Sequence, residues 1–427
     1  MSIMNSFFLP RLLSRQLGTL IRFNPTVSLR PVLTQSLRPH ACVFVQPLSC
    51  LTPKRSSSQQ GLFSRGHQQT RWKPAPPYRR KSSQEKMDPR IIYMVYASIT
   101  IGALLLGTIL FSRLKLIYKK YVHDIHTYYD APFGRRQKLI QYKGVVLPAM
   151  LENDLPKIRD FDVRPDDVWV VSWPRSGTTW VQEIVYLIHS DLDISQEEEK
   201  NIEQRFHFLE NIYPGLPAIA AKESPRLIKS HLPFQLLPEQ LSTVKPKIIY
   251  VVRNPKDILI SYYNFLKMLT PLKFVGTFEE FCDRFTKDKV YYSPWGKHVR
   301  TAVDLNQQHH NILIVQYEDL HKDLAGNVQR IAKFLGKELT PEQLLTICHR
   351  CLFKNMRQNK SVNYSWWDGY GIRDQTQTEF LRQGKVGDWK HYLTPFFSRR
   401  VEKMVKDNLT DVNLNIEYEL TVPPTVE

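Results

Sequence analysis

The chain has 427 residues, which allows one large domain or two smaller ones, and 42% of its residues are hydrophobic, as is ordinary for a protein with a buried core. Its formal net charge of +18 lies near the N-terminus, because residues 1–90 hold 15 Lys and Arg against two acids and residues 91–143 hold eight against two. Since the remainder is close to neutral, the overall basicity does not indicate a nucleic-acid-binding surface, and we expect no nucleic-acid partner.

Residues 1–86 have the composition of a targeting leader or extension rather than of a folded domain. They are rich in Ser, Pro, Gln and Arg and contain a single acid, Glu85. On a helical wheel Arg11, Arg15 and Arg22 share one face, and the leucines of the same stretch lie on the other. This pattern is typical of mitochondrial import signals, and a disordered extension has the same composition, so both interpretations stay open.

The segment Ile91–Phe111 is predicted to form one transmembrane helix. Its 21 residues are uncharged, which is enough to cross about 30 Å of hydrocarbon at a rise of about 1.5 Å per residue. Arg90 precedes the segment, and four basic residues follow it closely. Residues 112–143 then read as a basic juxtamembrane linker to a domain that begins at residue 144.

The orientation of this span depends on where the mature chain begins. Residues 71–90 hold seven basic residues against the four that follow the span, which places the N-terminus in the cytoplasm. If translation starts, or processing ends, near Met87, only Arg90 remains ahead of the span and the C-terminal domain faces the cytoplasm. We expect the second arrangement, a single-pass membrane protein with a cytoplasmic domain, and keep a mitochondrial membrane as the alternative.

Residues 144–427 alternate between strand-like and helix-like patterns, which indicates an α/β fold with a central parallel sheet flanked by helices. The strand-like runs are Val168–Val171, Leu227–Ile228, Lys247–Val252 and Ile312–Val315, and the clearest helical patterns are Ile258–Leu266 and Leu320–Leu335.

A phosphate-binding loop is predicted at Trp173–Trp180, between the run 168–171 and the helical pattern 181–187. A strand, a loop of small residues and a helix start together present unpaired N–H groups and the positive end of a helix dipole to an anion. Gly177 allows close approach of the backbone. The other candidate contacts are Arg175, Ser176, Thr178, Thr179 and Trp180. The loop is no Walker A motif, because it lacks the first Gly and the Lys.

Two further clusters lie at predicted strand ends, where α/β sheets bind their ligands. Lys229 and His231 follow the run 227–228, so His231 could be a general base beside a charge stabiliser, although a surface His explains the pattern equally well. Arg253 ends the run 247–252, and Ser261 follows about two helical turns later. This Arg and this hydroxyl can address one phosphate.

The cysteines do not predict a disulfide scaffold or a metal site. Five cysteines cannot all pair, and only Cys282, Cys348 and Cys351 lie in the predicted domain, which favours a reducing compartment. Cys348 and Cys351 form a C-x-x-C pattern, but it lies in a helical pattern and has no second pair, so helix packing is the better interpretation.

These motifs, taken together, resemble the cytosolic-type sulfotransferase family over about residues 140–415. Tyr317 in Tyr317-Glu318-Asp319 resembles the family's nucleotide-contacting Tyr. The segment Phe380–Lys390 is similar to its C-terminal RKGxxGDWK signature, with Arg382, Gln383 and Gly384 as the counterparts of RKG. The segment that resembles the one flanking the adenine comprises Cys351, Leu352, Phe353, Lys354, Asn355 and Met356.

The resemblance implies a P-loop-like sulfotransferase fold and 3′-phosphoadenosine 5′-phosphosulfate (PAPS) as donor, with no metal. It implies that the phosphate loop holds the 5′-phosphosulfate and that Arg253 with Ser261 holds the 3′-phosphate. His231 would remove the acceptor proton, Arg175 and Lys229 would stabilise developing charge, and Ser261 would help to position the donor. The acceptor is expected to be a small lipophilic molecule.

Three positions depart from the family pattern. Arg175 replaces the usual Lys of the phosphate loop, and a guanidinium protonates a leaving group less readily, so turnover is expected to be slow. Gln383 replaces a Lys, which removes a cation at the 3′-phosphate. The segment Lys390–Phe397 keeps Lys390 and Thr394 of the KTVE dimer motif but lacks its Val and Glu, so a homodimer is in doubt.

One alternative function stays open beside sulfuryl transfer. The segments 163–169 and 224–231 resemble the brain-type sulfotransferase-like subfamily, so the chain could be a membrane-tethered nucleotide-binding protein with little catalysis. A kinase or ATPase is disfavoured by the missing Walker Lys. A Golgi carbohydrate sulfotransferase would also have one N-terminal span, but its luminal domain usually carries paired cysteines.

Overall fold

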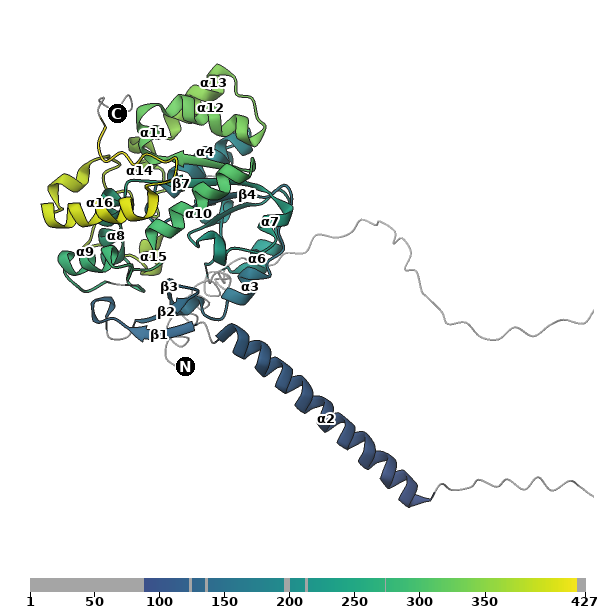
Figure 1. Ribbon diagram of the computed structural model, residues 1–427. Helices are drawn as coiled ribbons and strands as arrows, with labels where there is room; N and C mark the ends of the chain where they lie inside the picture. Colours follow the sequence, from purple (N-terminus) through teal and green to yellow (C-terminus); the bar gives the residue numbers. More distant parts are fainter. Residues whose placement is uncertain are drawn as a thin grey trace, which may run out of the picture. The chain divides into compact units, whose positions relative to one another are not determined.

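The computed structural model describes residues 88–122, 125–134, 137–195, 200–211, 214–272 and 274–420. The chain divides into two units, Met1–Leu106 and Gly107–Glu427. The predicted leader 1–86 lies outside the described residues. The helices and strands of the described part are shown in Figure 1.

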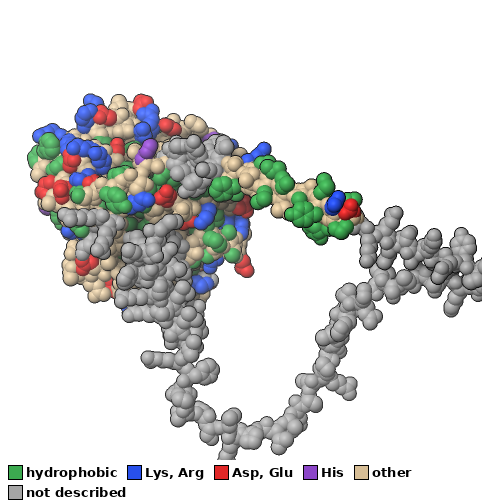
Figure 2. All heavy atoms as spheres, turned by 90° about the horizontal axis from the view of Figure 1, so that it is seen from below, with side chains coloured by type: hydrophobic (Ala, Val, Ile, Leu, Met, Phe, Trp, Pro, Cys, Tyr) green, Lys and Arg blue, Asp and Glu red, His purple; other side chains and the backbone are tan. Residues whose placement is uncertain are grey.

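The predicted span lies within one long helix, α2 (Pro89–Val122). Its segment Pro89–Leu114 has 26 residues and a mean hydropathy of 2.0, with none of that apolar window buried, so it is long and apolar enough to cross a membrane. Figure 2 shows hydrophobic side chains along its surface. The hydroxyls of Ser98 and Thr100 donate to backbone carbonyls one turn earlier, both at 2.8 Å, which satisfies these polar groups within the helix.

A small antiparallel sheet occupies part of the interval that we expected to be a linker. Its strands are β1 (Ile125–Tyr129), β2 (Lys138–Tyr142) and β3 (Val145–Pro148), in the order β1-β2-β3. Lys143 and Gly144 join β2 to β3 with φ of 48° and 78°, as a two-residue hairpin requires. Because Leu139 and Ile140 are buried in the same core as residues from the large sheet, residues 138–142 differ from a linker, and a boundary at residue 144 would cut this hairpin.

The parallel sheet of the predicted α/β fold is confirmed. Its five strands pair in the order β5-β6-β4-β7-β8, and every pairing is parallel. The strands are β4 (Val168–Ser172), β5 (His207–Phe208), β6 (Leu227–Ser230), β7 (Lys247–Val252) and β8 (Ile312–Gln316).

Two apolar cores cover the faces of this sheet, as the alternation along β4 demonstrates. Trp169 and Val171 belong to one core, whereas Val168 and Val170 belong to the other. The first core includes residues of α8 (Pro255–Met268), α9 (Phe278–Thr286), α10 (Trp295–Gln308) and α16 (Pro395–Leu409). The second core includes residues of α4 (Thr178–His189), α11 (Tyr317–Lys322), α12 (Leu324–Leu335) and α13 (Pro341–Arg350).

The remaining elements are short. The α-helices are α3 (Leu155–Arg159), α5 (Ile202–Arg205), α6 (Leu216–Ala220), α7 (Leu241–Val244), α14 (Phe353–Gln358) and α15 (Trp367–Tyr370). The 3₁₀ turns are η1 (Ala131–Phe133), η2 (Ala149–Leu151), η4 (Phe234–Leu236) and η5 (Asp388–His391).

The helix expected over Leu320–Leu335 is wrong in one respect, because α11 and α12 are separate helices. Asp323 lies between them with φ of −146° and ψ of 84°, outside the helical region. Its carboxylate accepts the N–H of Gly326 at 2.8 Å and so caps α12. The apolar periodicity continues across this break, which is why the pattern alone did not reveal it.

A buried ion pair joins the starts of β4 and β6. Arg226 donates from Nε and Nη2 to the two carboxylate oxygens of Asp167, at 2.8 Å and 2.6 Å, and both side chains are almost fully buried. The N–H of Val168 donates to the carbonyl of Arg226 at 2.9 Å. The pair therefore fixes two neighbouring strands whose opposite ends carry the predicted site residues.

Candidate active site

The predicted phosphate loop connects β4 to α4. Gly177 is the N-cap residue of α4 with φ of 97°, and among the described residues no side chain caps this helix start, so the N–H groups of Thr178 and Thr179 are left for another partner. Tyr317, from the start of α11, packs directly over the glycine, because a Cβ at position 177 would lie 2.5 Å from Cδ2 of Tyr317. Thus the structure brings together two predicted nucleotide contacts that are 140 residues apart.

Arg175 is held between two aromatic rings beside the loop. Its Nε donates to Oγ of Ser261 at 3.0 Å, and its Nη2 donates to the carbonyl of Phe380 at 2.8 Å. The guanidinium lies 4.8 Å from the ring centroid of Phe265 and 4.5 Å from that of Phe380. Burial, and then the charge of Arg253, lower the pKa of Arg175 to about 10, so it remains a cation at neutral pH.

Arg253 lies next to the same loop at the end of β7. Its Nη1 donates to the carbonyl of Arg175 at 3.2 Å and its Nη2 to that of Lys385 at 3.1 Å. The guanidinium stacks 4.1 Å from the ring centroid of Tyr317. The structure therefore places Arg175, Ser261, Arg253 and Tyr317 in one cluster around the phosphate loop.

Three donors in this cluster have no partner among the residues that the structure describes. They are Oγ of Ser176, Nε1 of Trp180 and Nε of Arg253, and each atom is buried. An unsatisfied buried donor costs about 1–3 kcal/mol. Positive charges and unpaired donors gathered at a helix N-terminus fit an anionic ligand.

The C-terminal signature contacts the predicted adenine-flanking segment 351–356, whose side chains differ in burial. Gly384 has φ of 64°, and a Cβ there would collide with the ring of Phe353, so these two predicted contacts adjoin. Of the other residues in the segment 351–356, Cys351 and Met356 are buried in the core, Leu352 and Asn355 are half-buried, and Lys354 is exposed. The six side chains of this segment therefore differ in their exposure, and two of them belong to the core.

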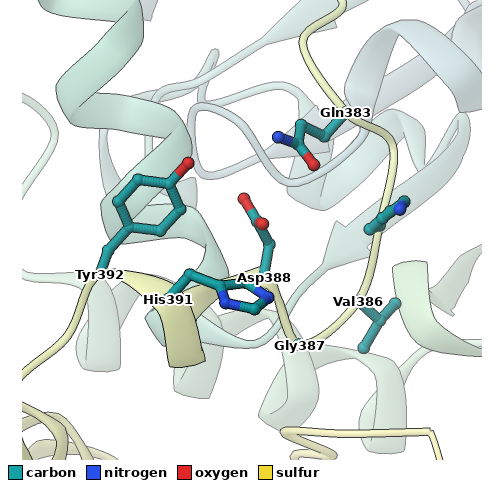
Figure 3. A pocket seen from close by; sticks show the side chains of 7 residues that line it. Gln383, Val386, Gly387, Asp388, His391 and Tyr392 are labelled. Atoms are coloured by element: carbon teal, nitrogen blue, oxygen red, sulfur yellow. The ribbon is translucent and has the colours of Figure 1, made fainter.

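Arg382 forms an ion pair with Asp388, the acid of the Gly-Asp-Trp-Lys run. Gln383 is exposed beside this pair, on a cavity of about 360 Å³ shown in Figure 3. The charge of Arg382 is thus already neutralised by Asp388.

Hydrogen bonds join the C-terminal signature to α8. Both carboxylate oxygens of Asp257 accept backbone N–H groups, from Gly387 at 2.8 Å and from Trp389 at 3.0 Å.

His231 lies just beyond β6 with one ring nitrogen engaged. Its Nδ1 is 3.0 Å from the carbonyl oxygen of Ser172, and its backbone N–H donates to Glu210 at 2.6 Å. Burial, and then the charge of Lys229, lower the pKa of His231 to about 3, so the imidazole is neutral at pH 7. A carbonyl can only accept, so Nδ1 carries the proton and Nε2 has the free lone pair.

Lys229 is surrounded by groups that the sequence did not single out. Its Nζ lies 3.1 Å from the hydroxyl of Tyr364, 3.5 Å from Oε1 of Glu203 and 4.3 Å from the ring centroid of Phe208. Burial lowers the pKa of Lys229, but the interactions with Tyr364 and Glu203 outweigh it, so the net shift is upward. Tyr364 also hydrogen-bonds Thr179, which links Lys229 to the phosphate loop.

Glu203, Glu210 and Tyr364 therefore contact the candidate site residues Lys229 and His231, and sequence reasoning missed them. No motif marks them, since each lies in a segment without a recognisable phosphate-loop or signature pattern. Tyr364 has φ of 62°, an unusual backbone conformation for this residue type that a sequence does not display.

The two cysteines of the C-x-x-C pattern lie at the end of α13. Cys351 is buried and Cys348 is half-buried, and burial raises the pKa of the Cys348 thiol. Within the described ranges, no group of three or more His, Cys, Asp and Glu is placed to hold a metal ion.

The parallel sheet thus ends at a loop surrounded by buried cations and unpaired donors, an arrangement that suits an enzyme that transfers an anionic group. The family model described as "Sulfotransferase domain" matches residues 165–413, and the chain therefore belongs to the sulfotransferase family. It is 35% identical to human sulfotransferase 4A1 over 68% of this chain and 97% of that protein. It is 37% identical to rabbit amine sulfotransferase over 67% of this chain and 95% of that protein.

Solved sulfotransferase structures share the fold and bind the desulfated donor, PAP. Retinol dehydratase in complex with androsterone and PAP aligns with a TM-score of 0.61 and 28% identity, covering 70% of this chain and 95% of that one. Mouse sulfotransferase SULT7A1 with PAP aligns with a TM-score of 0.52 and 25% identity, covering 64% and 96%. These complexes agree with PAPS as the donor of this enzyme.

Proposed function

We propose that this sulfotransferase moves the sulfuryl group of PAPS to a hydroxyl or amine of a small lipophilic acceptor. The observation that carries the proposal is the cluster of Arg175, Ser261 and Arg253 at the start of α4. Buried donors in this cluster have no partner among the described residues, so an anionic ligand can bind them. When bound, PAPS supplies an activated sulfuryl group. The phosphate loop would hold its 5′ end, and Arg253 with Ser261 would hold its 3′-phosphate.

The acceptor side of the proposal rests on His231. Because the Ser172 carbonyl fixes the proton on Nδ1, the Nε2 lone pair is available to take a proton from the acceptor. Glu210 holds the backbone of His231 in place, and Ser230 Oγ donates to the same carboxylate at 2.8 Å. Lys229 and Arg175 supply positive charge where the sulfuryl group would be transferred. The aromatic rings of Phe208 and Tyr292 flank His231 at 5.3 Å and 5.9 Å, which suits a lipophilic acceptor.

A transfer assay tests the proposal against the alternative of a nucleotide-binding protein with little catalysis. The full-length protein is incubated with sulfur-labelled PAPS and a panel of phenols, steroids and amines. Labelled product from any acceptor supports the enzyme. Tight PAP binding measured by calorimetry, with no product from the whole panel, supports the alternative.

Gly177→Ala is expected to weaken PAP binding about tenfold or more. The new Cβ would meet the Tyr317 ring at 2.5 Å and displace it, and φ of 97° also strains alanine, at a cost of roughly 1–2 kcal/mol for a left-handed residue. Calorimetric titration with PAP measures the effect.

Gly144→Ala is the matched control for this substitution. Gly144 also has a positive φ, 78°, but no described atom lies within 4 Å of an added Cβ, and it belongs to the β2–β3 hairpin and not to the phosphate loop. Equal losses of PAP affinity in the two variants would show that backbone strain, and not the contact with Tyr317, explains the result.

We further propose that α2 anchors the enzyme as a single-pass protein with the catalytic domain in the cytoplasm. The apolar surface of Pro89–Leu114 supports anchoring, and the few charges that precede the span, if the chain begins near Met87, support this orientation. The protein is expected to stay in the pellet after alkaline carbonate extraction, and protease added to intact organelles should digest the domain. Release by carbonate argues against anchoring, and protection of the domain argues for the opposite orientation or a mitochondrial interior.

A further inference from the structure

The carboxylate of Glu203 lies beside Lys229, one of the proposed catalytic residues, and the function proposed above gives it no role. Glu203 belongs to α5, whose start is fixed by a capping box between Asn201 and Gln204, and the Asn201 side chain also accepts the N–H of Glu203 at 3.1 Å. The side chain of Glu203 is 19% exposed, so a ligand can reach it, whereas that of Lys229 is only 6% exposed. Glu203 therefore offers a positioned negative charge at the edge of the site.

The neighbours of Glu203 place it on the acceptor side. Lys229 Nζ lies 3.5 Å from Glu203 Oε1 and 4.3 Å from the ring centroid of Phe208, and that ring meets the imidazole of His231 edge-on at 5.3 Å. A small acceptor whose reacting atom is within reach of His231 would thus lie against Phe208 and close to Glu203.

Glu203 also has unused capacity for a cation. Its distance to Lys229 is at the long end of an ion pair, and in the part of the chain that the structure describes its second oxygen accepts no hydrogen bond. The nearby Glu210 differs, because its two oxygens already accept from Ser230 and from the backbone of His231. An anionic donor would compete with Glu203 for Lys229, which leaves the carboxylate in need of a cationic partner.

We propose that Glu203 selects acceptors that carry a protonated amine, so that the preferred acceptor class is a phenol with an ammonium side chain. This inference rests on the proposed function. The ammonium pairs with Glu203 while the ring packs on Phe208. The phenolic oxygen forms the new O–S bond, the bond from sulfur to the bridging phosphate oxygen breaks with its electron pair leaving on PAP, and the phenolic proton moves to Nε2 of His231. The ammonium keeps its protons.

Three acceptors that differ only in side-chain charge test the proposal: tyramine, 4-ethylphenol and 3-(4-hydroxyphenyl)propionate. With full-length protein and saturating PAPS at neutral pH, kcat/KM is expected to fall in that order, with tyramine above 4-ethylphenol by about tenfold, the factor that one partly buried ion pair supplies. Glu203→Gln keeps the size of the side chain and removes its charge, and it should bring the ratio of the two values close to one.

The control variant is Glu338→Gln, which removes an exposed carboxylate from the loop before α13. It should keep the ratio of the wild-type protein. Equal kcat/KM for the three acceptors in the wild-type protein overturns the proposal without need of any variant. A Glu203→Gln enzyme that changes both values in parallel overturns it as well, and shows that Glu203 acts only by restraining Lys229. No product from any acceptor, in contrast, refutes the proposed function and the inference with it.

Discussion

His231→Ala is expected to lower kcat for sulfuryl transfer by about 10²–10⁴-fold, the range that a positioned general base contributes. The neutral imidazole, with its proton fixed on Nδ1 by the Ser172 carbonyl, is the group that we propose accepts the proton of the acceptor. Because the proposed donor contacts lie around Arg175 and Arg253, PAP binding should change by less than about tenfold. Single-turnover kinetics with labelled PAPS measure the first effect, and calorimetry measures the second.

The same measurements on His310→Ala provide the control. His310 is exposed in the turn before β8 and has no part in the site. Its variant should transfer sulfate at the wild-type rate. If His231→Ala retains most of its activity, another group removes the acceptor proton and the assignment of His231 is wrong.

Asp167→Ala is expected to reduce the free energy of unfolding by about 3–5 kcal/mol. The substitution removes both carboxylate oxygens that Arg226 contacts and leaves a buried guanidinium without its counterion. Since the pair joins the starts of β4 and β6, the loss should also loosen the strands that carry the phosphate loop and Lys229. Urea unfolding followed by tryptophan fluorescence measures the change.

The adjacent residue supplies the control for this prediction. Asp166 is exposed and accepts the hydroxyl of Ser224 at 3.0 Å. Asp166→Ala should change the unfolding free energy by about 0.5 kcal/mol or less. Similar losses in the two variants would mean that burial of the Asp167–Arg226 pair does not determine its contribution.

The central sheet could be predicted from the sequence because buried parallel strands are continuous runs of apolar residues. The run 247–252 coincides with β7, and the run 168–171 lies within β4. β5 escaped prediction because it has only two residues, which is too short to show a period. The hairpin of β2 and β3 was missed because the basic residues around it gave the interval the composition of a linker.

The donor side of the site was more predictable than the acceptor side. Arg175 and Ser261 were expected from strand ends and the phosphate-loop pattern, and they form a hydrogen bond. Glu203 and Tyr364 meet Lys229 from segments that precede and follow it by many residues. Such contacts follow from the packing of the whole domain, and no local spacing predicts them.

The contact between Asp257 and the C-terminal signature has a consequence for biosynthesis. Gly387 and Trp389 are translated 130 and 132 residues after the carboxylate to which they donate. The carbonyl of Lys385, to which Arg253 donates, is likewise translated long after Arg253. Because Arg253 is proposed to hold the 3′-phosphate, we expect the nucleotide to bind only after the signature has left the ribosome, and therefore not to guide folding of the nascent chain. Until then the apolar strands of the emerging domain depend on pairing with one another or on chaperones.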